Sequence, residues 1–290
     1  MQNHNFEFLA MTTPCKVQIY KESKAKALHC FEEIKKNTLY LEKKYNFYDK
    51  TSFLSKKINH RNTNRIKVDT QTATILEQIR TLSQKVNNHF DITIGTLKEC
   101  YTYQNIDDVN HSIEKLQGKY GIDSWDIQGR ILTFKYDETK IDLGGVIKEY
   151  AVDEAVKIVK KHGILSAIIN FGGDIFCVGK KDINSLFSIG IKNPKDKTHN
   201  LFSVNLENQA LTTSANYERN ITIEDKKFSH IISTQTKNDE ILSATVISNS
   251  VLKSGIYSTS FMITSELDIS EDIKVALIDN DLKIHQNIQT

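Results

Sequence analysis

The sequence predicts an α+β fold built mainly from antiparallel sheets with flanking helices. Helical patterns with one apolar face occur at three places, and stretches rich in β-branched and aromatic residues lie between and after them. The helices do not alternate strictly with the strands, and several neighbouring strands are close enough in sequence to pair as antiparallel hairpins. These observations favour α+β over a doubly wound parallel sheet.

Three segments have the apolar spacing of a helix with one buried face. From Lys24 to Tyr45, apolar residues recur mostly every three or four positions among Lys and Glu. A second helix is expected to begin after Asp69, a good N-terminal cap, and to end before Asn87. A third is expected over residues 146–161. Strands are expected at 16–20, 131–136, 167–178, 187–191, 210–213 and 244–248.

The composition is that of one ordinary globular unit. The 290 residues are 39% hydrophobic and no Gly/Ser-rich or Pro-rich linker divides them. We therefore expect a single domain over residues 1–290, either one compact unit or two lobes that share a cleft. The 38 Lys and Arg are interspersed with 36 Asp and Glu, which argues against nucleic acid as a partner. No stretch has the length of a transmembrane segment, and the first residues lack an export signal. We therefore expect a cytoplasmic protein, or a periplasmic one if a signal segment has been removed.

The cysteine pattern predicts neither a zinc site nor a redox motif. Cys15, Cys30, Cys100 and Cys177 are 15, 70 and 77 residues apart, with no Cys-x-x-Cys pair and no histidine at a zinc-like spacing. Buried free thiols are expected instead.

Two glycine pairs flank the third predicted helix. Gly144 and Gly145 directly precede it, where backbone N–H groups at the positive helix end can face an anion, and Lys148 adds a full charge. Gly172 and Gly173 interrupt the apolar segment 167–178, where glycine weakens a strand unless a bulge or a closely bound ligand requires it. Neither pair matches a Walker A or a G-x-G-x-x-G pattern. Because one helix joins the two pairs, we expect them to line one pocket.

Seven short motifs follow one another in an order and approximate spacing that are shared with a known family. Met11-Thr-Thr13 is similar to Met-Gly-Thr, residues 52–59 to Ser-x-Leu-Ser-x-Leu-Asn with one extra residue, and residues 90–95 to Phe-Asp-Pro-Thr-Val-Gly. Residues 142–153 are similar to Asp-Leu-Gly-Gly-x-x-Lys-Gly-Tyr-Ala-Val-Asp, with Glu149 in place of one glycine. The other matches are 170–174, 189–194 and 213–219. Together they resemble the ApbE family of FAD:protein FMN transferases over most of the chain.

The resemblance implies a bilobed α+β fold with FAD in a cleft between the lobes. It implies a Mg2+-dependent transfer of FMN from FAD to a threonine hydroxyl of an acceptor flavoprotein, with release of AMP. His230, in the motif 228–232, becomes the candidate base for that hydroxyl, and Lys148 the cation at the diphosphate. Contacts to FAD, or support for its pocket, are expected from Met11, Asn59, Asp91, Gly144, Gly145, Lys148, Gly172, Gly173 and Asp174.

Two parts of the chain depart from the family pattern. The metal-binding Asp and Thr of the family fall on Ser254 and Ser258, and a neutral hydroxyl is a poor replacement for a carboxylate at Mg2+. Residues 233–237 read Ser-Thr-Gln-Thr-Lys where the family has Asp-Pro-Arg-Thr-Gly, so a carboxylate and a guanidinium are lost. Lys253, Glu149 and Asp174 offer replacement charges, and the sequence does not choose among them.

Several functions stay open at this level. The main hypothesis is an FMN transferase that uses FAD. The alternatives are an FAD-binding protein that has lost catalysis, a pyrophosphohydrolase that cleaves FAD to FMN and AMP with water, and an empty cleft that serves protein contacts. The motifs for binding are nearly complete, whereas metal-dependent catalysis has lost its expected carboxylates.

Overall fold

An eight-stranded antiparallel sheet forms the centre of the molecule. The computed structural model describes residues 2–102, 105–196, 198–215, 220–223, 226–229 and 240–288. The strand order in the sheet is β1-β2-β6-β7-β10-β13-β14-β15. These strands are β1 Gln2–Ala10, β2 Thr13–Glu22, β6 Ala167–Phe171, β7 Asp174–Val178, β10 Gln209–Ala215, β13 Ile241–Ser248, β14 Lys274–Asp279 and β15 Ile284–Gln286.

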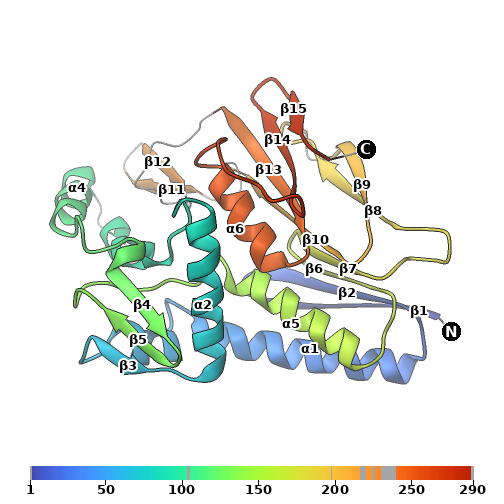
Figure 1. Cartoon of the computed structure of the whole chain (residues 1–290), viewed down its shortest axis with the longest axis horizontal. Coiled ribbons are helices and arrows are strands. Elements are labelled where there is room, and N and C mark those ends of the chain that lie inside the picture. The colour runs from blue at the N-terminus through green and yellow to red at the C-terminus, as the bar shows by residue number, and fades with distance from the viewer. Residues whose placement is uncertain are drawn as a thin grey trace.

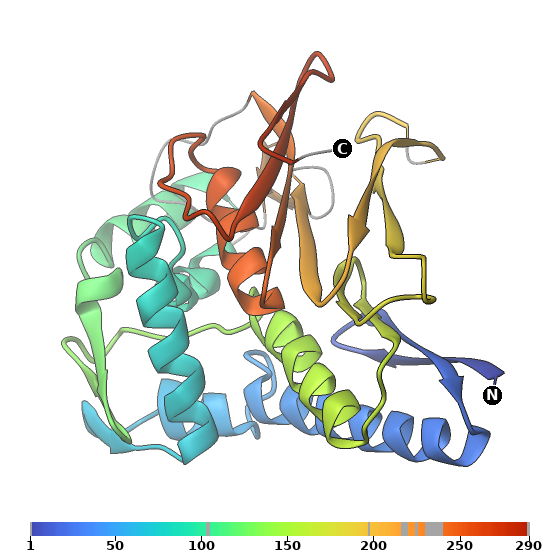
Figure 2. The same cartoon turned by 45° about the vertical axis from the view of Figure 1, so that its right-hand side comes forward.

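Both faces of this sheet are covered. Helices α1 Lys24–Tyr45, α5 Ile147–Lys161 and α6 Val251–Phe261 pack on one face, and Figures 1 and 2 show α1 and α5 running side by side. The hairpin of β8 Phe187–Lys192 and β9 Asn200–Leu206 packs on the other face. Every residue of β7 is therefore buried: Phe176 and Val178 join the helix-side core, while Ile175 and Cys177 join the hairpin-side core.

A second group of elements lies at the end of the molecule away from the N-terminus (Figure 1). Helix α2 Thr70–Lys85 packs against α6 and against the small antiparallel sheet β3-β5-β4. The other elements are β3 Arg65–Lys67, β4 Trp125–Gln128, β5 Ile131–Phe134, α3 Gly95–Lys98, α4 Ile106–Lys115 and the short helical turns Leu54–Asn59, Ile92–Ile94, Glu99–Thr102 and Ile122–Ser124. A separate hairpin consists of β11 Asn220–Ile223 and β12 Lys226–Ser229.

The structure confirms the α+β class and the antiparallel sheets. The first predicted helix has the predicted bounds, and Asp69 caps α2 by accepting a hydrogen bond from the N–H of Thr72 at 2.9 Å. Within the described part of the chain, no helix combines the length and apolar character needed to cross a membrane. The two lobes with a ligand cleft between them stay a prediction.

One strand prediction is wrong. The segment 167–178 is not a single strand but the hairpin β6–β7, in which Phe171 pairs with Asp174 and Gly172-Gly173 forms the turn. Both glycines have positive φ angles, 63° and 103°, which suit a tight two-residue hairpin turn and end the first strand. The glycines therefore reverse the chain, and the two apolar halves pair with each other.

Helix α6 is an element that the hydrophobic periodicity does not indicate. Its sequence contains a glycine, four serine or threonine residues and β-branched residues, all of which have modest helix propensity. It has no continuous polar face, because nearly every side chain in it is buried. Its N-terminus is capped by Ser250, which accepts a hydrogen bond from the N–H of Lys253 at 3.3 Å. Burial and this cap explain a helix that amphipathic patterning misses.

All four cysteines are buried thiols outside any disulfide bond, as the sequence predicts. Burial raises the pKa of Cys15 to about 11 and the pKa values of Cys30 and Cys177 to about 12. Because the thiolate is the reactive form, iodoacetamide at pH 8 is expected to leave these thiols unlabelled in the native protein and to label them in guanidinium. Mass spectrometry of intact protein measures this difference, and fast labelling of native protein would contradict it.

Candidate functional site

Two tight turns lie next to each other at one end of the main sheet. Met11 and Thr12 form the turn between β1 and β2, with φ angles of 52° and 57°, and Gly172-Gly173 forms the turn between β6 and β7. The turns are neighbours because β2 pairs with β6, and the N–H of Gly172 donates to the carbonyl of Pro14 at 3.2 Å. Two turns that are roughly 160 residues apart in the sequence thus lie side by side.

Gly172 is required by both its conformation and its surroundings. Its φ is positive, and a Cβ added there would lie 2.4 Å from Cγ2 of the buried Thr13. Gly173 has no heavy atom within 4 Å of such a Cβ, so only its φ of 103° disfavours a side chain. The N–H of Gly173 is held by the side-chain oxygen of Asn170 at 2.9 Å. The pair leaves an exposed stretch of backbone beside the Met11 turn.

The segment that leads into α5 is fixed by Asn59 from an adjacent helical turn. The Asn59 amide donates to the carbonyl of Ile141 and accepts from its N–H, both at 2.8 Å. The N–H of Asp142 donates to the carbonyl of Ile92, also at 2.8 Å. Asn59 is buried and uses both ends of its amide in this way. Asn59 thus supports the backbone that leads into α5, and its expected role at FAD stays a prediction.

Only one of the two glycine N–H groups before α5 is available to an anion, whereas the sequence predicts that both are. The carboxylate of Asp142 accepts a hydrogen bond from the N–H of Gly144 at 2.9 Å and forms an ion pair with Lys98. The N–H of Gly145 has no protein acceptor among the described residues. An anion at this helix end can therefore use the amide of Gly145, whereas that of Gly144 is already occupied by Asp142.

Lys148 joins the two glycine segments. Its ammonium forms an ion pair with Asp174, the first residue of β7, and lies 3.8 Å from Oε1 of Glu149. Both carboxylates are more than nine-tenths buried, since Glu149 is 8% exposed and Asp174 is 3% exposed. Burial raises the pKa of Glu149, with Lys148 opposing that shift. The structure thus brings Lys148 and Asp174 together as the sequence predicts, and adds Glu149.

Glu149 also contacts α6. A Cβ added to Gly255 would lie 2.7 Å from Cγ of Glu149 and 3.4 Å from its Oε1. Gly255 directly follows Ser254 in the sequence. The departure from the family pattern at 149 therefore lies against Gly255, the residue next to the other departure, Ser254.

Ser254 and Ser258 are fully buried and face the sheet. The hydroxyl of Ser254 shares a hydrogen bond of 2.9 Å with Ser248, and that of Ser258 shares one of 2.9 Å with Ser214. Both hydroxyls are therefore already hydrogen-bonded to protein partners. The described residues contain no group of three or more His, Cys, Asp or Glu arranged to hold a metal ion. The expected role of the two serines as metal ligands stays a prediction.

Two further predicted site residues have different outcomes. Asp91 accepts hydrogen bonds from the N–H and the hydroxyl of Thr93, at 2.8 and 2.7 Å, and so caps a short helical turn. Its pKa is raised by burial. His230, the predicted base, and residues 233–237 lie outside the described residues. Their roles rest on the sequence resemblance.

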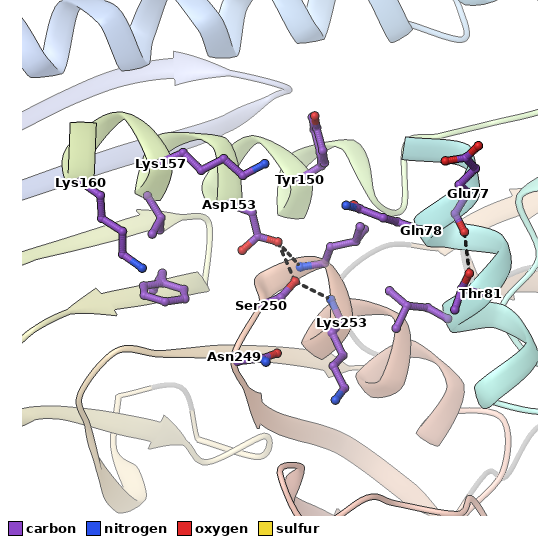
Figure 3. A pocket seen from close by; sticks show the side chains of 14 residues that line it. Glu77, Gln78, Thr81, Tyr150, Asp153, Lys157, Lys160, Asn249, Ser250 and Lys253 are labelled. Atoms are coloured by element: carbon purple, nitrogen blue, oxygen red, sulfur yellow. Dashed lines mark hydrogen bonds between the residues drawn. The ribbon is translucent and has the colours of Figure 1, made fainter. Parts of the chain in front are cut away.

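A cavity of about 580 Å3 opens between α2, α5 and α6 (Figure 3). Its lining includes Tyr150, Lys157 and Lys253, and none of the predicted site residues. On its floor, Asp153 accepts hydrogen bonds from the hydroxyl of Ser250 at 2.8 Å and from the N–H groups of residues 251 and 252 at 2.8 and 3.0 Å. These hydrogen bonds at the cavity fix the start of α6 against α5. Sequence reasoning assigned no role to Asp153, although it closes the motif 142–153.

Asp153→Ala is expected to destabilise the protein by about 2 kcal/mol, because it removes a helix cap from α6. Asp153→Asn keeps an acceptor oxygen and is expected to lose less stability. Urea unfolding of the two variants and the parent protein measures the difference. Equal stability of Asp153→Ala and the parent would show that these hydrogen bonds contribute nothing to the free energy of unfolding.

Comparison with known proteins identifies the family. Residues 11–276 match the family model described as the ApbE family. A FAD:protein FMN transferase of Vibrio cholerae serotype O1 is 25% identical over 228 residues, or 76% of this chain and 68% of the relative. A protein of the same name from Buchnera aphidicola subsp. Baizongia pistaciae is also 25% identical, over 92% of this chain and 84% of the relative.

Solved structures show the same fold. The ApbE protein from Thermotoga maritima matches with a TM-score of 0.84 at 22% identity, over 98% of this chain and 97% of that chain. The flavin transferase ApbE from Vibrio cholerae matches with a TM-score of 0.81 at 20% identity, over 98% and 96%. The family model spans most of the sequence, and all seven motifs lie within its range. This chain belongs to the ApbE family.

Proposed function

We propose that this protein is an FAD:protein FMN transferase. In the reaction, a threonine oxygen of an acceptor flavoprotein attacks the FMN-side phosphorus of FAD. The bond from that phosphorus to the bridging oxygen breaks, AMP leaves with the bridging oxygen, and the hydroxyl proton passes to a base. The products are a phosphodiester-linked FMN and AMP. The observation that carries the proposal is the family match over residues 11–276, and curated relatives in that match are named for this activity.

The arrangement around Lys148 supports this proposal. Attack on a diphosphate requires positive charge and hydrogen-bond donors at the phosphoryl oxygens. Lys148 and the amide of Gly145, at the start of α5, offer such groups. The ion pair of Lys148 with Asp174 brings this region toward the exposed turn at Gly173, whose own N–H is taken by Asn170. We assign these groups to the diphosphate of FAD. Met11, in the neighbouring turn, is assigned to the wall of the same site.

Mg2+ belongs to the proposal as well. Bound at such a site, a magnesium ion supplies positive charge to phosphoryl oxygens. The hydroxyls of Ser254 and Ser258 are engaged by serines of the sheet, so they offer little to a hard cation. The buried carboxylates of Glu149 and Asp174 fit such an ion better, since Glu149 Oε2 has no hydrogen-bond partner among the described residues.

The remaining steps are assigned to the chain's own residues. His230 is proposed as the base that accepts the threonine proton, because imidazole titrates near neutral pH. Asn59 positions the backbone of residue 141, and Asp142 fixes the start of α5.

The test is an incubation of purified protein with FAD, Mg2+ and an acceptor domain that the Vibrio cholerae transferase modifies. We expect a fluorescent acceptor in a denaturing gel and one AMP for each FMN attached. Free FMN and AMP in equal amounts, with an unmodified acceptor, would indicate the pyrophosphohydrolase. Bound FAD without any turnover would indicate a binding protein. The Vibrio cholerae transferase serves as the positive control.

A further inference from the structure

We propose that Glu149 of α5 and Asp174 of β7 form the carboxylate pair that holds a divalent cation beside Lys148. The proposal rests on the proposed function, because it places the cation at the diphosphate-binding end of the site. It assigns the metal to two elements, α5 and β7, and to a residue that stands where the family motif has glycine.

Both carboxylates lie close to the Lys148 ammonium. The Lys148 ammonium forms an ion pair with Oδ2 of Asp174 and lies 3.8 Å from Oε1 of Glu149. The side chain of Glu149 is held in place from behind by Gly255, where any larger residue would collide with its Cγ. The backbone of α6 therefore packs closely against this side chain and limits where it can move.

One oxygen of the pair has no partner at all in the described structure. Glu149 Oε2 is buried and accepts no hydrogen bond from any described residue. Asp174 Oδ2 has the Lys148 ammonium as its ionic partner and no further donor among the described residues. Native proteins rarely leave buried carboxylate oxygens in this state, and binding of a cation would satisfy them.

The charges around the pair are not balanced. Lys148 brings one positive charge to two carboxylates, and Asp153 on the same helix adds negative potential at Glu149. A buried carboxylate without a compensating charge is costly, and it would also repel a diphosphate. A divalent cation balances both carboxylates and attracts the phosphoryl oxygens. Carboxylate oxygens are the ligands that Mg2+ and Mn2+ prefer, and Mg2+ commonly uses only one or two of them together with substrate phosphates.

Protonation of Glu149 is the competing explanation for the unbalanced charge. A neutral carboxyl group needs no cation and could donate a hydrogen bond to a phosphate. Glu149→Gln distinguishes the two, because glutamine has the shape and the donor of a protonated glutamate but cannot serve as an anionic ligand. Glu154→Gln is the matched control, since Glu154 is on the same helix and forms an ion pair with the exposed Lys157, away from Lys148 and Asp174.

The experiment measures Mn2+ binding directly, by the loss of the electron paramagnetic resonance signal of free Mn2+ in the presence of metal-free protein, with and without FAD. We expect Glu149→Gln and Asp174→Asn each to weaken Mn2+ binding by about tenfold or more, and Glu154→Gln to leave it unchanged. FAD binding is followed separately in chelator, by flavin absorbance that stays with the protein after gel filtration.

The two readouts separate the failure of this inference from the failure of the proposed function. If the parent protein and all variants retain FAD, and Glu149→Gln binds Mn2+ like the parent, the carboxylate pair is not the metal site. Parent protein that retains FAD but takes up no Mn2+ overturns the inference in the same way. If the parent protein does not bind FAD, the proposed function fails first and the inference fails with it.

Discussion

Lys148→Met is expected to lower the rate of FMN transfer by about two to three orders of magnitude, because it removes a positive group from the phosphoryl oxygens in the transition state. Methionine keeps the apolar part of the side chain, so packing at the start of α5 changes little. The ammonium that it removes is the ionic partner of Asp174 and lies close to Glu149. The expected loss appears in kcat as well as in kcat/KM.

Lys157→Met is the matched control for this variant. Lys157 lies on the same helix and lines the cavity in Figure 3. Its side chain is largely exposed and forms an ion pair with Glu154. We expect it to transfer FMN at nearly the parent rate. Urea unfolding of both variants checks that neither has lost its fold. Equal activities of Lys148→Met and Lys157→Met would remove Lys148 from the site.

Gly172→Ala is expected to have the largest effect on stability. A residue with a side chain in a left-handed conformation costs about 1–2 kcal/mol. The new Cβ would also lie 2.4 Å from Cγ2 of Thr13, and overpacking of this kind costs about 1–3 kcal/mol. The two turns at this end of the sheet would have to separate, so FAD binding is expected to weaken together with stability.

A double variant isolates the steric part of that effect. Thr13→Ser removes the Cγ2 methyl group that collides with the new Cβ, while it keeps a hydroxyl at this position. Urea unfolding of Gly172→Ala, Thr13→Ser and the double variant forms a thermodynamic cycle. The double variant is expected to be more stable than the sum of the single changes predicts. Strict additivity would contradict the proposed contact between the two turns.

The elements with strong local signals could be predicted from the sequence. The helix Lys24–Tyr45 has a regular apolar face, and α2 begins at the predicted cap, Asp69. The glycine segments were expected to share a pocket, and the fold does bring Lys148 of the first segment to Asp174 of the second. Regular spacing and capping are local properties of the chain, so they can be recognised without knowledge of tertiary contacts.

Features that depend on packing could not be predicted in this way. Helix α6 has no amphipathic pattern because it is buried on nearly all sides. The sequence shows Glu149 and Ser254 as separate departures from a family pattern, and only the packing of α5 on α6 brings Glu149 against Gly255. The occupied amide of Gly144 likewise depends on the rotamer of Asp142. Helix α6 and the contact of Glu149 with Gly255 depend on tertiary packing, and the occupied amide of Gly144 depends on a side-chain conformation. The local spacing of residues specifies none of them.

A crystal structure of the protein with FAD tests the central claim most directly. That claim is that residues 142–148 and 172–174 surround the diphosphate of the flavin nucleotide. We predict phosphate oxygens within hydrogen-bond distance of the Lys148 ammonium and the amide of Gly145, with the Met11 turn against the nucleotide. A diphosphate bound elsewhere, for example in the cavity between α2, α5 and α6, would contradict the account.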